Sequence, residues 1–84
     1  MNTQSKEQAV LLAREIKEAL ETLQVALNDG AEEREVVEAK NIVANVLRSY
    51  KVFQENLPAE ERKEAHDIFA KKIETLISQA KRLN

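Results

Sequence analysis

His66 is the only histidine in the 84-residue chain, and it is the first side chain to consider for chemistry. An imidazole beside Asp67 can act as a general base or as a pH sensor. Its position one turn before Phe69 instead predicts a ring at the edge of a helical core, partly buried and reaching water or a carboxylate. A metal site would need at least two further ligands, and only carboxylates are present to supply them. The pattern favours a structural histidine and predicts no metal site.

Paired carboxylates are the second candidate for chemistry. Adjacent glutamates point about 100° apart on a helix, so they do not converge on one substrate atom. Glu60 and Glu64 share a face, as do Glu18 and Glu21. A di-iron site in a helical bundle needs an inward-facing Glu-x-x-His motif, whereas the corresponding stripes here are apolar. We therefore interpret the carboxylates as solvated helix faces that pair weakly with Lys and Arg.

Nucleophiles and phosphate-binding loops find no support in the sequence. The hydroxyl residues Ser49, Ser78, Thr22 and Thr75 have no basic partner in a recognisable arrangement. Gly30 is the only glycine, which excludes the glycine-rich phosphate loops, and the absence of cysteine excludes thiolate chemistry and cysteine metal sites. The sequence predicts no catalytic residue and no cofactor, and so a protein that is not an enzyme.

Composition predicts one small globular domain covering residues 1–84. Apolar residues make up 43% and charged residues 33%, so the chain resembles neither a disordered nor a membrane protein. No run approaches the roughly 20 apolar residues that cross a bilayer, and the first residues lack a signal-peptide layout. We therefore expect a cytoplasmic protein. The net charge of −2 argues against general nucleic-acid binding.

The stretch 35–57 has the clearest structural pattern. Its apolar residues are Val36, Ala39, Val43, Val46, Tyr50, Phe53 and Leu57, at steps that alternate between three and four residues. This spacing keeps side chains on one face of a helix. Ile42 and Leu47 widen the stripe on opposite sides, which suits a helix with a neighbour on each flank. We predict that this stretch is the middle helix of three.

Two breaks delimit the other helices. Gly30 ends the first helix in the manner of a left-handed residue, and Pro58 suits the first position of the third. The predicted helices cover about 5–28, 31–56 and 58–83, with connections of two or three residues. Near-equal lengths and short connections predict an all-α fold, an antiparallel up-down-up three-helix bundle.

Caps and core stripes follow from the same pattern. Ser5 with Gln8 forms a capping box for the first helix, with Thr3 as an earlier alternative, and Asp29 with Glu32 can cap the second. The first helix has the series Ala9, Ala13, Ile16, Leu20, Leu23 and Leu27, with Leu12, Ala19 and Ala26 beside it. The third has Phe69, Ile73, Leu76, Ala80 and Leu83, with Ala70 and Ile77 alongside.

Several apolar residues fall outside these stripes and should be exposed. Leu11 and Val25 lie two heptads apart on one outer face of the first helix, with Glu18 between them, and Val52 lies off the stripe of the second. Val10 and Val37 belong either to the core margin or to that outer surface. Scattered exposed apolar residues are normal, but a strip of them can be a contact surface for a second copy or another protein.

Three functional hypotheses remain. The first is a non-enzymatic protein–protein interaction module, of the adaptor, regulatory or immunity type, that presents a helix face to a partner. The second is a self-associating structural protein, an obligate dimer whose core is completed between chains. The third is a nucleic-acid-binding regulator, which requires the basic residues of the third helix, Lys63, Lys71, Lys72, Lys81 and Arg82, to form one patch. No small-molecule substrate is indicated.

Overall fold

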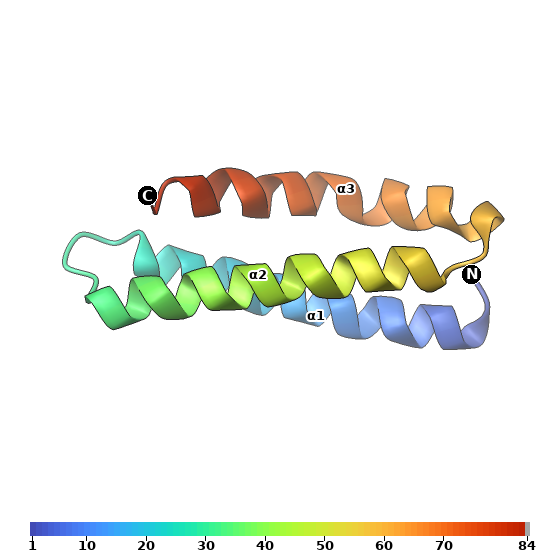
Figure 1. The fold of residues 1–84 in the computed structure, drawn as a ribbon, viewed down its shortest axis with the longest axis horizontal. Helices are drawn as coiled ribbons and strands as arrows, with labels where there is room; N and C mark the ends of the chain where they lie inside the picture. The colour runs from blue at the N-terminus through green and yellow to red at the C-terminus, as the bar shows by residue number, and fades with distance from the viewer. Residues whose placement is uncertain (84) are drawn as a thin grey trace.

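The computed structural model describes residues 1–83 as three α-helices that run side by side along one long axis (Figure 1). They are α1 (Thr3–Ala26), α2 (Glu33–Asn56) and α3 (Ala59–Lys81). The chain runs up, down and up through a body of 45 × 18 × 15 Å, and each helix packs against both others. The predicted all-α, antiparallel three-helix bundle is confirmed.

One apolar core runs along the axis where the three helices meet. The stripe of α2 is placed as predicted, with Val36 and Tyr50 at its margin. The ring of Phe69 from α3 lies edge-on to Tyr50 and Phe53 of α2, with ring centroids 6.0 and 5.9 Å apart. Such edge-to-face pairs add about 0.5–1.5 kcal/mol each beyond the area they bury. These contacts fix the position of α3 against α2.

The core face of α1 is rotated from the predicted one. Its buried apolar residues are Leu12, Ile16, Ala19, Leu23 and Ala26. The residues expected at the centre of the stripe, Ala9, Ala13 and Leu20, are only partly buried, and Leu27 lies just beyond the helix. Residues 9–13 are apolar without interruption, so several faces of α1 satisfy the same period and packing against α2 and α3 selects among them.

The start of α1 also differs from the prediction. The cap is Asn2, whose side-chain oxygen accepts a hydrogen bond from the amide of Ser5 at 2.8 Å. Asparagine caps a helix as well as serine does, and a start at Thr3 places Ser5 one heptad before Leu12 on the buried face. The Ser5 capping box was therefore wrong, and Ser5 is the one buried polar residue among those described.

The first connection is longer than predicted and covers residues 27–32. Gly30 has φ +89°, the left-handed conformation expected of it, but it lies within the loop and not at the end of α1. The cap of α2 is Glu32, whose amide donates to the side chain of Glu35 at 3.0 Å, so the proposed Asp29 cap was wrong. Gly30 turns the chain within the connection. The capping pair of Glu32 and Glu35, which follows this turn, defines the start of α2.

The second connection is as short as predicted. Pro58 caps α3, so the helix begins one residue later than expected, at Ala59. Arg62, in the first turn of α3, donates from its guanidinium to the carbonyl oxygens of Gln54 (3.2 Å) and Leu57 (3.1 Å) at the end of α2. Carbonyls at a helix C-terminus lack intrahelical donors, and a cation there also complements the helix dipole.

The buried face of α3 corrects the interpretation of His66. Ala65 is fully buried, whereas the next residue, His66, is exposed and does not belong to the core. Ile77, predicted alongside the core, is exposed at its edge. The helix ends at Lys81, so Leu83 packs on the core from beyond the helix. The series of Ala65, Phe69, Ile73 and Leu76 leaves no room for His66 on that face.

Candidate interaction surface

The groove between α1 and α2 brings together two of the residues predicted for partner binding. Leu11 is 54% exposed and Val52 is 51% exposed, and both line a groove of about 500 Å³. The buried side chains of Leu12 and Phe53 line it as well, so the groove joins the protein core to its surface. An exposed leucine and valine above buried apolar side chains form the kind of depression that accepts an apolar side chain from a partner.

The groove continues along α1 and becomes acidic. Its second part, of about 440 Å³, shares Glu15 and Asn45 with the first, so the two are contiguous. Its carboxylates are Glu15, Glu18 and Glu21, all from α1, and Ile42 and Val46 of α2 add apolar surface. Glu18 was predicted to lie within the contact strip, and the structure places it in this acidic part. We call the whole feature the α1/α2 groove.

The charges of the α1/α2 groove do not cancel. Within residues 1–83 none of its three glutamates forms an ion pair. The one cation that lines the groove, Arg48, donates to the side-chain oxygen of Asn45 at 3.0 Å. The lining therefore carries a net negative charge of −2, from three glutamates and one arginine. An excess of carboxylates beside apolar surface favours a ligand that is both cationic and apolar.

The other two predicted residues lie elsewhere. Val25 is exposed as expected, two heptads from Leu11 on the same side of α1, which is about 21 Å along the helix. Val10, which the sequence left unassigned between core margin and surface, lines a different groove on the opposite flank of α1, facing α3. The expected exposure of Leu11, Val25 and Val52 is confirmed, and Leu11, Glu18 and Val52 line one groove, whereas their role in partner binding stays a prediction.

Sequence reasoning missed other exposed apolar side chains. Ile68 on α3 is half-exposed although it directly precedes the buried Phe69. Its helical position, one residue off the series that buries Phe69 and Leu76, is the signal that could have identified it. Val37 on α2 is exposed and borders a separate shallow depression. It therefore belongs to the outer surface and not to the core margin.

The basic residues of α3 are spread around the helix. Lys72 lines the groove between α3 and α1, whereas Lys81 lines the groove between α3 and α2. Lys71 and Lys72 are adjacent and so point about 100° apart. The single basic patch that the nucleic-acid hypothesis requires is therefore not formed.

No group of three or more acidic or histidine side chains in residues 1–83 gathers in a geometry that could hold a metal ion. No helix of that part of the chain is long and apolar enough to cross a membrane. No protein-family model matches the chain, and neither curated proteins nor solved structures gave a match.

Proposed function

We propose that the protein is a non-enzymatic protein–protein interaction module that binds a cationic amphipathic helix along the α1/α2 groove. The observation that carries the proposal is the pairing of half-exposed Leu11 and Val52 with the unpaired carboxylates that follow them in the same groove. Amphipathic helices commonly dock by placing an apolar stripe in a groove, with charges at its edges.

The dimensions of the groove define the partner segment. Leu11 and Val52 line one part of the groove, and Ile42 and Val46 line the acidic part. The α1 residues of the lining run from Gln8 to Thr22, so a matching helix has about 14 residues, or four turns, with apolar residues on one face and Lys or Arg at its edges. The apolar contacts supply most of the affinity, whereas the charges set orientation and exclude acidic competitors.

The test uses a synthetic probe of that design, a blocked peptide of about 14 residues with leucines on one face and lysines at both edges. We call it the cationic peptide. Its binding to the 84-residue protein is followed by fluorescence anisotropy at low salt. We expect Val52→Asp to weaken binding at least about tenfold, because it removes apolar contact from the groove.

Val37→Asp is the matched control. Val37 has the same residue type on the same helix and nearly the same exposure, 50% against 51%, but it does not line the α1/α2 groove. Both variants add one negative charge, so a general electrostatic effect strengthens binding of the cationic peptide equally in both. Equal affinities of the two variants would contradict the proposal, as would wild-type protein that does not bind the peptide at all.

A second copy of the chain is the alternative occupant, and one observation favours it. Glu15 and Arg48 line the groove beside Leu11 and Val52, so the patch carries both signs of charge and can face its own copy across a two-fold axis. This is the self-associating form of the protein. It predicts a mass near twice 9.6 kDa by light scattering, which falls on dilution and is abolished by Val52→Asp.

A further inference from the structure

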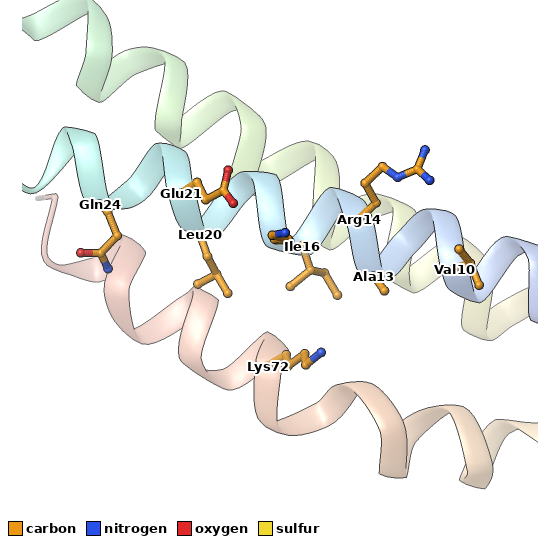
Figure 2. Close-up of a pocket in the computed structure, with 9 residues that line it drawn as sticks. Val10, Ala13, Arg14, Ile16, Leu20, Glu21, Gln24 and Lys72 are labelled. Carbon is orange, nitrogen blue, oxygen red and sulfur yellow. The ribbon is translucent and has the colours of Figure 1, made fainter.

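A second groove, of about 650 Å³, lies on the other flank of α1, where α1 faces α3. Figure 2 shows the side chains of Ala13, Ile16 and Leu20 pointing from α1 toward α3. Val10 stands at one end and is 61% exposed, whereas Ala13 and Leu20 are partly buried. Lys72 is the one α3 residue that lines this groove, and Ile16 is only 1% exposed, so the open apolar surface comes from Val10, Ala13 and Leu20. We call it the α1/α3 groove.

Polar bridges join α1 and α3 near both ends of this groove. The backbone amide of Asn2 donates to the Glu61 carboxylate at 3.0 Å, where α1 begins. The side-chain amide of Gln24 donates to the side-chain oxygen of Gln79 at 3.1 Å, near the end of α1. The groove between them runs from Val10 to Gln24, which is about 21 Å of helix. The lining residues thus give the groove a length of about four helical turns, within the longer stretch between the two bridges.

The charges around the α1/α3 groove are mainly positive. Arg14, Lys17 and Lys72 line it, against the single carboxylate of Glu21. Figure 2 shows Arg14 and Glu21 pointing away from the apolar floor and Lys72 entering from α3. Lys17 lies one turn from both Ala13 and Leu20 and so borders the floor. Within the described chain, residues 1–83, none of the three cations forms an ion pair.

We propose that the α1/α3 groove binds an anionic amphipathic helix from another protein, which packs as a fourth helix beside α1 and α3. Leucine-type residues of that helix cover Val10, Ala13 and Leu20, and glutamates or aspartates at its edges meet Lys17 and Lys72. The occupant is anionic because Lys17 and Lys72 form no ion pair within residues 1–83 and the lining, with Arg14 and Glu21, carries a net charge of +2. It is helical because the lining follows α1 for about four turns.

This site lies on the opposite flank of α1 from the α1/α2 groove, with Glu21 at the border of both, and it extends the proposed function. Helix α1 lies between two grooves of opposite charge, with Glu18 on the α2 flank and Lys17 on the α3 flank. One partner helix can occupy each groove without touching the other groove's floor. The chain is then an adaptor that brings two different helices to opposite flanks of α1.

The test uses an anionic peptide, identical to the cationic peptide except that glutamate replaces each lysine. Binding to the full 84-residue chain is measured by anisotropy at low salt for wild type and for the double variant Lys17→Glu/Lys72→Glu. We expect the variant to lose at least about tenfold in affinity for the anionic peptide, because both edge contacts become repulsive. Binding of the cationic peptide to the α1/α2 groove serves as the check that the variant is folded.

The matched control is Lys51→Glu/Lys63→Glu, which changes net charge by the same amount at exposed lysines that line neither groove. An equal loss of affinity in this control would overturn the proposal, because it would show that net charge alone governs binding. Absence of any anionic-peptide binding to wild type would overturn it as well. Free protein whose mass doubles by light scattering, and returns to 9.6 kDa in Lys17→Glu/Lys72→Glu, would assign the groove to a second copy instead.

Discussion

Leu11 and Leu12 are adjacent residues of the same type, and the structure assigns them opposite roles. Leu12 is 3% exposed within the core, whereas Leu11 is 54% exposed in the α1/α2 groove. Replacing each in turn with alanine changes helix propensity equally in both variants. The difference in their stability therefore measures the contribution of core packing. The pair tests the assignment of Leu12 to the core and Leu11 to the surface, on which the location of the groove depends.

The expected magnitudes differ several-fold. Leu12→Ala removes a buried side chain, and such changes cost about 2–5 kcal/mol. Because Leu12 also borders an open groove, the site can relax, and we expect about 2–3 kcal/mol. This loss corresponds to a fall in Tm of about 10–20 °C for a domain of this size. Leu11→Ala removes a half-exposed side chain, and we expect a change within about 0.5 kcal/mol.

Urea unfolding followed by circular dichroism at 222 nm measures both variants, and equal m-values show that the comparison is of stability alone. Leu11→Ala should also weaken binding of the cationic peptide, because Leu11 lines the groove. Equal losses of stability in the two variants, or a larger loss in Leu11→Ala, would refute the assigned face of α1 and with it the α1/α2 groove.

Two predictions concern the connections between helices. Gly30→Ala should lower the free energy of unfolding by about 1–2 kcal/mol, because φ is +89° there and no atom lies near enough to a new Cβ to add a steric term. Arg62→Met keeps an extended side chain but removes the donors to Gln54 and Leu57, so urea unfolding should show a loss of about 1–2 kcal/mol. No loss in Arg62→Met would show that water satisfies those carbonyls equally well.

The stripe of α2 could be predicted from sequence, whereas that of α1 could not. In α2 the apolar residues alternate at steps of three and four from Val36 to Leu57, and no uninterrupted apolar run is longer than three residues, so the period selects one face. In α1 residues 9–13 are all apolar, and the burial of Leu12 over Ala13 depends on where α2 and α3 pack. Periodicity within one helix carries no information about its neighbours.

The ends of the helices were harder to predict for a related reason. Asn2 and Ser5 can each cap α1. Asp29, or Glu32 paired with Glu35, can cap α2. Local chemistry does not choose between candidates that lie so close in sequence. The choice is made by packing, because the start at Asn2 buries Ser5 beside the core. Pro58 has no such competitor, and its boundary was predicted to within one residue.

The two grooves could not be predicted from the sequence. Exposure of Leu11, Val25 and Val52 followed from their positions off the stripes, and the structure agrees. Each helix has nearly equal numbers of acidic and basic residues, so its composition does not reveal that most acidic residues of α1 line one flank and most of its basic residues the other. Glu18 and Lys17 are adjacent in sequence but border different grooves, and this separation is visible only when the neighbouring helices are in place.

The central claim, that the α1/α2 groove is a docking site for a cationic amphipathic helix, is tested most directly by locating a bound helix on the protein. The measurement is a titration of ¹⁵N-labelled protein with the cationic peptide, followed by ¹H–¹⁵N correlation spectra. We predict saturable shift changes concentrated at Leu11, Glu15, Glu18 and Val52, with little change at Lys72. Changes centred on the α1/α3 groove, or none at saturating peptide, would contradict the claim.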